Sequence, residues 1–440
     1  MRTRAGYRLV ALDGRQRDSP PRNCALGPDI SRATSGSRLD TDGCWFIWDP
    51  DAVLWSASRH AERCPSHVWN PVHRPRLQPK AVRGLNRAWN LYRVQRVDTS
   101  EFNYHLPTRF IAQKPVEPRD SARLLVLHRD TDQVEHRTFR QIGDYLETGD
   151  VLVLNRTRVI PARLWARKTT GGRVELLLLR RIDASAWECL VGGSGVRLGT
   201  RLYVEGGPPA EVVSEADAST RIVRFESPVN DFLSRAGHVP LPPYIHQSPD
   251  DPERYQTVYG DVPGSAAAPT AGLHFTPELL ESLQRRGVEI AHLVLHVGLD
   301  TFLPVTESDP ARHRIHREWC EVPRATVEAI RAARSLGRRV VAVGTTTART
   351  LESAAERLGA GVAPPRRLVR EYSGETSLFI LPGYEFRVVD ALVTNFHLPR
   401  STLLMMVSAF AGRERVLRAY EIAQREEYRF YSFGDAMLIL

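Results

Sequence analysis

Three apolar segments in the C-terminal half of the chain run directly into polar residues. The segments span residues 288–297, 339–343 and 388–393, and the residues that follow them are 298, 344–349 and 394–399. A nearly continuous apolar run is typical of a strand that is covered on both faces in a parallel sheet. Ligands of open α/β sheets bind beyond the carboxyl ends of the strands. We therefore expect these three strand exits to build one site.

The same patterns place further elements in a large α/β domain with a mostly parallel sheet. Strands are predicted at 123–128 and 150–154, and helices near 139–146 and 231–236. Another helix is predicted at 277–286, because Thr276 is a good N-cap and Pro277 suits the first helical position. The α/β domain is expected to comprise residues 97–158 and 230–440.

Short β-rich runs between residues 159 and 229 predict a second, smaller domain. They recur at 174–179, 187–191, 201–204, 210–213 and 221–225, separated by Gly-Gly and Pro-Pro turns. Regularly spaced short strands with turn residues between them are typical of a small antiparallel barrel or sandwich. We expect a small antiparallel β-barrel domain, residues 159–229, inserted into the α/β domain.

Residues 1–96 differ from the rest of the chain in hydrophobic periodicity, tryptophan content and charge. They show no sustained period of 2 or 3.6 and contain five of the eight tryptophans, and they carry 17 Lys and Arg against 8 Asp and Glu. The whole excess of +9 therefore lies in this segment, and residues 97–440 are formally neutral. We interpret residues 1–96 as a disordered extension or a mis-started reading frame; a basic RNA-contacting arm is the alternative.

Cysteine spacing and hydropathy narrow the class of protein. The five cysteines form neither the close pairs of a zinc site nor a dense disulfide framework. No apolar run has the length of a membrane span, and the N-terminus lacks the apolar core of a signal peptide. We expect a soluble, cytoplasmic protein that does not bind a membrane.

The polar residues at the strand exits are the candidates for chemistry. Imidazoles exchange protons near neutral pH, so His274, His296 and His397 are candidates for acid–base catalysis, although a lone histidine is more often a structural hydrogen-bonding group. The run from Gly344 to Arg349 contains three threonines at a predicted helix N-terminus. Such a segment binds a phosphate or carboxylate, or simply caps its helix.

The segment around His313 and His316 has the spacing His-x-x-His, with Glu318 two residues further on. That spacing invites a metal site, but no other Cys or His lies nearby at ligand spacing, and the adjacent glutamate of the His-Glu-x-x-His hydrolases is missing. The alternative is a short helix that begins with Asp309 as N-cap. We expect no metal site here.

Residues 97–440 resemble the S-adenosylmethionine:tRNA ribosyltransferase-isomerase family of queuosine biosynthesis. The resemblance is carried by long motifs such as residues 388–410, VVDALVTNFHLPRSTLLMMVSAF. That motif lies within the segment 379–411, and the other segments are 97–113, 155–164, 237–245, 255–259, 268–275, 295–302, 344–352 and 428–437. Residues 1–96 have no counterpart in the family, which suggests a true start near Val97.

The resemblance implies an α/β domain with an inserted β-barrel and a specific reaction. The ribosyl group of S-adenosylmethionine is transferred to 7-aminomethyl-7-deazaguanine at the tRNA wobble position and isomerised, and adenine and methionine are released. S-adenosylmethionine is then a co-substrate, no cofactor is needed, and a monomer is expected. This reaction needs a base for the proton acidified by the sulfonium and an acid for the departing adenine, for which His274, His296 and His397 are the candidates.

Other residues receive candidate roles from the same resemblance. Thr345, Thr346 and Arg349 are candidates for binding the methionine carboxylate or an RNA phosphate. Asn155, Arg158 and Arg163 are candidates for binding the tRNA backbone. Substrate-binding positions that match family motifs without a separable role are Thr270, Gly272, His313, His316, Glu318 and Asn395.

Two positions depart from the family pattern, which keeps other functions open. Asp300 replaces a glycine and Arg317 replaces a serine, so each changes the charge or space near the expected site. The alternatives are a catalytically impaired tRNA-binding homologue and an S-adenosylmethionine-dependent tRNA methyltransferase. The methyltransferase is disfavoured because no Gly-x-Gly-x-x-Gly follows a predicted strand.

A shortened chain tests the interpretation of residues 1–96. A chain beginning at Val97 is expected to fold and to keep its turnover, because the deleted segment shows no periodic apolar pattern with which to pack. The measurement is chemical unfolding of both chains. A loss of more than about 2 kcal/mol in the free energy of unfolding would show that the segment packs on the core.

Overall fold

The computed structural model describes residues 37–39, 45–49, 52–56, 97–215, 220–247, 249, 251–298, 304–313, 315–355 and 369–440. The chain divides into two units, Met1–Arg93 and Val94–Leu440. In the first unit, β1 (Ser37–Leu39), β2 (Trp45–Asp49) and β3 (Ala52–Ser56) form an antiparallel sheet that the sequence analysis did not predict. The rest of residues 1–96 lies outside the described residues, so their interpretation as an extension stays a prediction.

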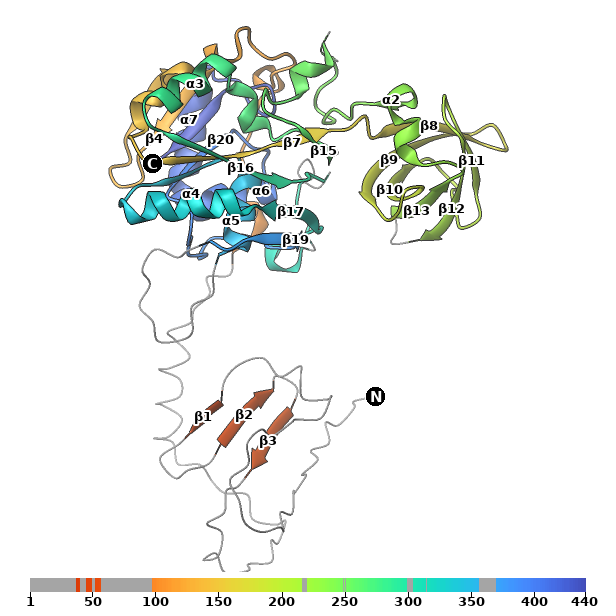
Figure 1. Cartoon of the computed structure of the whole chain (residues 1–440), viewed down its shortest axis with the longest axis horizontal. Coiled ribbons are helices and arrows are strands. Elements are labelled where there is room, and N and C mark those ends of the chain that lie inside the picture. The colour runs from red at the N-terminus through yellow and green to blue at the C-terminus, as the bar shows by residue number, and fades with distance from the viewer. Residues whose placement is uncertain are drawn as a thin grey trace, which may run out of the picture. The chain divides into compact units, whose positions relative to one another are not determined.

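The second unit is built around a nine-stranded mixed sheet, with the order β19-β17-β16-β6-β18-β20-β21-β4-β5. Figure 1 labels β19, β17, β16, β20 and β4 of this sheet. Its centre is parallel and consists of β16 (Glu289–Leu295), β6 (Val151–Asn155), β18 (Val340–Val343) and β20 (Ala391–Asn395). These strands include the three predicted apolar segments, so their carboxyl ends lie at one edge of the sheet.

Antiparallel pairings enclose this centre on both sides. Beyond β16 lie β17 (Glu318–Val322) and β19 (Tyr372–Thr376), and beyond β20 lie β21 (Ala436–Ile439), β4 (Arg123–Leu127) and β5 (Val134–Thr138). Only the pair β21–β4 among these flanking pairs is parallel in the described residues. The α/β prediction is confirmed, with a parallel centre and antiparallel edges.

The central strands are apolar throughout because both of their faces are covered. Val151 and Val153 belong to one buried cluster, whereas Leu152 and Leu154 belong to another. Successive side chains of a strand point to opposite faces, so the alternation assigns one cluster to each face of the sheet. The period-2 signal is therefore lost in the sequence although the strands are regular.

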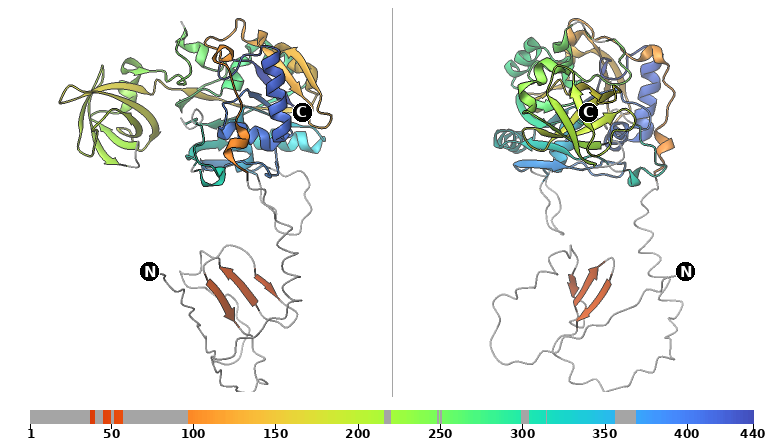
Figure 2. Two further views of the ribbon diagram at one scale, coloured as in Figure 1. Left: turned by 180° about the vertical axis from the view of Figure 1, so that it is seen from behind. Right: turned by 90° about the vertical axis from the view of Figure 1, so that its right-hand side faces the viewer.

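Helices cover the two faces unequally. The first cluster includes residues of α4 (Arg324–Ser335), α5 (Thr345–Ser353), α6 (Thr402–Ala411) and α7 (Arg413–Arg425). The blue helices α6 and α7 lie side by side (Figure 2). The second cluster includes Leu279 and Leu283 of α3 (Pro277–Arg285). As predicted, Thr276 caps α3, because its side chain accepts a hydrogen bond from the backbone of Leu279.

Short 3₁₀ helices complete the described chain. They span Thr99–Phe102, Thr108–Phe110, Arg119–Ser121, Phe139–Tyr145, Val229–Asp231, Pro252–Tyr255, Thr270–His274 and Pro310–Arg312. The helix expected near 139–146 is thus a 3₁₀ helix. The helix expected at 231–236 is a 3₁₀ turn followed by the four-residue α2 (Leu233–Ala236).

The inserted domain is a closed six-stranded antiparallel barrel, as predicted. Its strands are β8 (Arg163–Lys168), β9 (Arg173–Arg181), β10 (Ala186–Gly192), β11 (Arg201–Val204), β12 (Pro209–Glu215) and β13 (Thr220–Phe225). Pairing of β11 with β8 closes the barrel. The six strands form the yellow-green part of the ribbon (Figure 1), and they enclose an apolar cluster of their own.

The barrel extends further along the chain than residue 229, its expected end. Phe232, Leu233 and Ala236 pack in the barrel cluster, and β14 (Gly237–His238) pairs with β8. Before the barrel, β7 (Thr157–Val159) pairs in parallel with β15 (Val262–Ser265), which follows it. The segments that enter and leave the barrel region are therefore hydrogen-bonded to one another.

One strand begins later than its apolar pattern predicts. The carboxylate of Glu352, which is 3% exposed, accepts hydrogen bonds from the backbone N–H groups of Arg387, Val388 and Val389. Because these groups serve the carboxylate, they do not join the sheet, and β20 starts at Ala391. Thr394 and Asn395 therefore lie within the strand instead of after it.

The carboxamide of Asn155 joins the ends of β6 and β16. Its Oδ1 accepts from the backbone N–H groups of Thr157 and Leu295, both at 3.1 Å, and its Nδ2 donates to the carbonyl of Leu295 at 3.0 Å. The residue is fully buried. This side chain fixes the position of the residues that leave both strands.

Replacing Asn155 with alanine tests this joint. We expect Asn155→Ala to lower the free energy of unfolding by about 2–4 kcal/mol, because it leaves several buried backbone groups without partners. The exposed Asn103→Ala is the control and is expected to change it by less than about 0.5 kcal/mol. Equal values for the two variants in urea titrations would contradict the assignment.

Candidate active site

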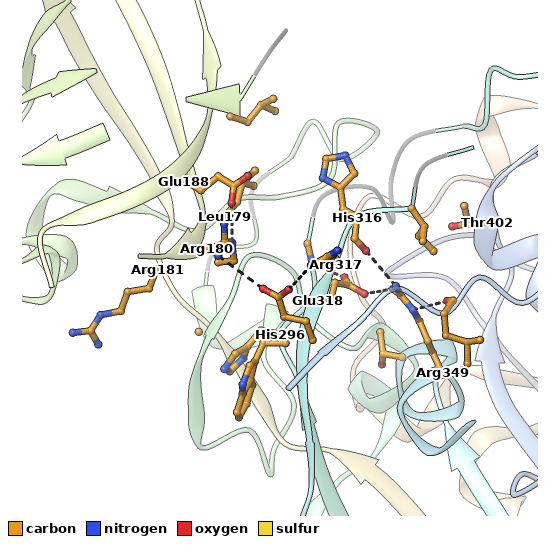
Figure 3. Close-up of a pocket in the computed structure, with 18 of the residues that line it drawn as sticks. Leu179, Arg180, Arg181, Glu188, His296, His316, Arg317, Glu318, Arg349 and Thr402 are labelled. Atoms are coloured by element: carbon orange, nitrogen blue, oxygen red, sulfur yellow. Dashed lines mark hydrogen bonds and ion pairs between the residues drawn. The ribbon is translucent and has the colours of Figure 1, made fainter. Parts of the chain in front are cut away.

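A cavity of about 970 Å³ lies between the barrel and the carboxyl edge of the sheet. His296 and Gly298 follow β16, while Thr345, Thr346 and Arg349 follow β18, and all five line the cavity. On the barrel side the wall contains Arg180, Arg181, Trp187 and Glu188. Figure 3 shows the labelled barrel residues opposite Arg349 and Thr402. Two of the three predicted strand exits thus meet at one cavity.

His296 is the predicted catalytic histidine that lines the cavity. Its Nδ1 lies 2.8 Å from the hydroxyl of Thr157, and its ring stacks on Trp319 with centroids 5.2 Å apart and planes 22° apart. Burial lowers its pKa to about 4. The imidazole is therefore neutral at physiological pH and held in a defined orientation.

Gly264 on β15 lies against the other side of this imidazole. A Cβ atom at position 264 would lie 2.6 Å from both Cε1 and Nε2 of His296, which is far closer than carbon atoms approach one another. Its φ of +149° is also one that side-chain-bearing residues rarely adopt. Only glycine lets the ring occupy this place.

Arg349 and Glu318 form a buried ion pair in the wall, with both side chains 9% exposed. Glu318 also accepts from the backbone N–H of Gly298 at 2.7 Å. The guanidinium of Arg349 donates further to the carbonyls of Leu378, His316 and Thr376. Figure 3 shows Arg349 beside Glu318 and His316. Four of the five N–H donors of Arg349 are used by protein groups, so Arg349 organises the wall, and its predicted role in binding a substrate anion stays a prediction.

The N-terminus of α5 faces the cavity through Thr345 and Thr346. Gly344 is the N-cap residue with a φ of +91°, and the hydroxyl of Thr347 donates to the carbonyl of Val343. The hydroxyl of Thr347 is thus bound to the last residue of β18. Thr345 and Thr346 remain placed to meet an anionic group, since the positive end of the helix dipole lies behind them.

The structure separates His274 and His397 from the cavity. His274 stacks on Phe139 with ring centroids 4.9 Å apart, and burial lowers its pKa to about 3. His397 is 8% exposed, its Nε2 lies 2.6 Å from the hydroxyl of Thr394, and burial lowers its pKa to about 3. Neither residue lines the cavity, and both are held by contacts within the core, so their catalytic role stays a prediction.

The remaining predicted substrate residues fall into two places. Thr270 donates to Oδ1 of Asn395 at 2.8 Å, and Gly272 packs against Tyr259, so these three predicted residues stabilise the core beneath the site. His316 lines the cavity, whereas Nδ1 of His313 lies 2.9 Å from Glu307. As predicted, Asp309 caps the short 3₁₀ helix before His313.

The predicted tRNA residues do not form one surface. Asn155 is fully buried with its amide engaged by backbone groups, so the prediction that it binds tRNA is wrong. Arg158 pairs with Glu253, and Arg163 on the barrel pairs with Glu175 at 2.8 Å. Both arginines are about one-third exposed and remain candidates.

The sequence analysis missed the barrel side of the cavity. Arg180 pairs with Glu188 at 2.8 Å and lies 3.9 Å from Glu375, which Arg317 approaches to 3.4 Å. Trp187 is 6% exposed, and its Nε1 has no hydrogen-bond partner in the described part of the chain. Nothing local in the sequence marks these residues, because their role follows from the approach of a second domain.

The departure at Arg317 therefore lies in the cavity wall, where it adds a positive charge paired with Glu375. Asp300 lies outside the described residues.

Among the residues that the structure describes, no group of three or more His, Cys, Asp or Glu could hold a metal ion. No helix in the described ranges has the length and apolar character needed to cross a membrane.

The lowered histidine pKa values predict acid sensitivity. Folded pKa values of about 3 to 4 lie below the unfolded value of about 6.5, so the unfolded chain binds more protons as pH falls below 6.5. The free energy of unfolding should therefore decrease from pH 7 to pH 5.

His397→Asn tests one of these contributions. Each buried neutral imidazole contributes up to about 1.4 kcal/mol per pH unit between the two pKa values, so the variant should show a shallower decrease by about this amount. The measurement is urea unfolding at pH 7, 6 and 5. An unchanged slope would show that His397 is not buried in the neutral form.

Comparison with known proteins places the chain in a family. The family model described as queuosine biosynthesis protein matches residues 99–439. An S-adenosylmethionine:tRNA ribosyltransferase-isomerase from Thermotoga maritima is 53% identical over 342 residues, covering 78% of this chain and 99% of the relative. The protein of that name from Moorella thermoacetica is 54% identical over 346 residues, covering 77% and 99%.

A solved structure is also similar to this chain. The crystal structure of an S-adenosylmethionine tRNA ribosyltransferase from Thermotoga maritima is 45% identical, covers 78% of this chain and 100% of its own, and has a TM-score of 0.44. From the family match and the curated relatives, the chain belongs to the queuosine biosynthesis protein family.

Proposed function

We propose that this chain is an S-adenosylmethionine:tRNA ribosyltransferase-isomerase. It transfers the ribosyl group of S-adenosylmethionine to 7-aminomethyl-7-deazaguanine at the tRNA wobble position, isomerises it, and releases adenine and methionine. The proposal is supported by two curated relatives of that name, each of which is matched over 99% of its length. S-adenosylmethionine is a co-substrate here, and no other cofactor is required.

The observation that carries the proposal is a neutral histidine in a cavity large enough for two reactants. Ligand pockets usually measure about 300–1,000 Å³, so a cavity of about 970 Å³ leaves room for a nucleobase beside a small substrate. An enzyme that acts on a base must bring that base out of its stack into such a pocket. His296 lies in the wall of this cavity, and burial lowers its pKa, so that the imidazole is in its neutral form.

The wall also suggests how the charged parts of the substrates are bound. Thr345 and Thr346 at the N-terminus of α5 are placed for the methionine carboxylate or a phosphate. The arginines at the barrel side, Arg180 and Arg181, are candidates for the tRNA backbone because phosphate contacts hold RNA in register. We expect the protein to act as a monomer in the cytoplasm.

Product analysis tests the reaction. The chain is incubated with S-adenosylmethionine and tRNA that contains 7-aminomethyl-7-deazaguanine, and nucleosides and small products are identified by mass spectrometry. Epoxyqueuosine with equimolar adenine and methionine is the expected result. S-adenosylhomocysteine would indicate a methyltransferase, and tRNA binding without turnover would indicate an impaired homologue.

Histidine variants test the assignment of the site. His296→Ala should lower the single-turnover rate by roughly 10²–10³-fold, the usual effect of removing one preorganised polar group that acts on the reacting atoms. His397→Ala should lower the melting temperature while the folded molecules keep a near-normal rate. His128→Gln is the control for the loss of an imidazole, because His128 pairs with Glu135 and does not line the cavity. Its single-turnover rate should be unchanged. A His397→Ala rate as low as that of His296→Ala would return His397 to the catalytic site.

A further inference from the structure

Thr157 holds His296 through the only side-chain contact that its hydroxyl makes in the described part of the chain. The hydroxyl oxygen lies 2.8 Å from Nδ1 of His296, and Thr157 is 1% exposed. A buried hydroxyl needs an acceptor for its hydrogen. Among the described residues, Nδ1 of His296 is the one acceptor that this hydroxyl reaches, which favours donation from the hydroxyl to the ring.

The contact is fixed from several sides. Oδ1 of Asn155 accepts hydrogen bonds from the backbone N–H groups of both Thr157 and Leu295, and Leu295 is the residue before His296. Trp319 stacks on the imidazole, and Gly264 leaves no room for a Cβ atom beside its Cε1, Nε2 and Cδ2 atoms. These contacts restrict the orientation of the ring.

A neutral imidazole carries one proton, so the partner of one nitrogen decides the chemistry of the other. If Nδ1 accepts from Thr157, the proton is on Nε2. Within the described residues Nε2 has no hydrogen-bond partner, and His296 lines the cavity. Nε2–H is then a hydrogen-bond donor for whatever occupies the cavity.

We infer that Thr157 is a positioning residue that fixes the proton of His296 on Nε2, so that His296 donates a hydrogen bond to the substrate instead of removing a proton from it. The inference rests on the proposed function. In that reaction the bond between adenine and the sugar breaks, and the electron pair of the bond goes to the purine. A fixed neutral donor stabilises the negative charge that develops there without transferring its own proton, and the departing adenine takes up its proton from water.

Magnetic resonance of the histidine nitrogens tests the tautomer without any assay of activity. Protein labelled with ¹⁵N-histidine is measured at pH 7 by long-range ¹H–¹⁵N correlation, and the His296 signals are those missing in His296→Ala. Signals of the Nε2–H form are expected in the natural chain and in Thr157→Ser, which keeps the hydroxyl. Signals of the Nδ1–H form in the natural chain would overturn the inference.

Kinetics test the positioning role. Thr157→Val keeps the shape of the side chain but removes the hydroxyl, and it should lower kcat by about 10–100-fold, the usual effect of losing an outer hydrogen-bond partner of a functional histidine. KM should stay within about twofold of the natural value, because ground-state binding is unchanged. Thr157→Ser should restore most of kcat.

A matched variant controls for the loss of a buried hydroxyl. Thr326 is 2% exposed, and its hydroxyl donates to the carbonyl of His292, so Thr326→Val makes the same chemical change at a residue that does not line the cavity. It should lower stability and leave kcat unchanged. A kcat for Thr157→Val equal to that of Thr326→Val would refute the positioning role. An Nε2–H signal in a chain without turnover would instead reject the proposed function and leave the tautomer assigned.

Discussion

The candidate site depends on the hydrogen bonds by which the carboxamide of Asn155 links the ends of β6 and β16. This amide, at the end of β6, hydrogen-bonds to the backbone of Thr157 and of Leu295 at the end of β16. It therefore fixes the two segments that carry Thr157 and His296. The strands beneath this joint are rigid because both of their faces are buried in close-packed clusters. Apolar packing thus supplies a firm base, and a single polar side chain sets the geometry above it.

Much of the fold could be predicted because its signals are local. Apolar runs predicted the strands β6, β16 and β18, and the Thr-Pro pair predicted where α3 begins. The evenly spaced β-rich runs predicted a small barrel, although not the added residues up to Ala236 that complete its core. The exits of β16 and β18 were also located correctly, since parallel strands must end at the same edge.

The roles of single residues could not be predicted from the sequence, because they depend on burial and on hydrogen-bond partners that lie far away along the chain. His296 and His397 both follow or end apolar strands, yet one lies at the cavity and the other turns into the core. Arg349 lies one turn into its helix, where a guanidinium often binds anions, but Glu318 and three carbonyls occupy it. The barrel wall was missed because it reaches the site through long-range contacts.

The close approach of Gly264 to His296 has a consequence for reading other sequences of this family. A methyl group at this position would occupy the space of the imidazole, which Trp319 prevents from moving aside. Alanine there would also be strained by the φ of +149°, so the change would act on the backbone of β15 as well as on the ring. Glycine at this position is thus a condition, readable from the sequence, for the imidazole to take the place it has in this chain.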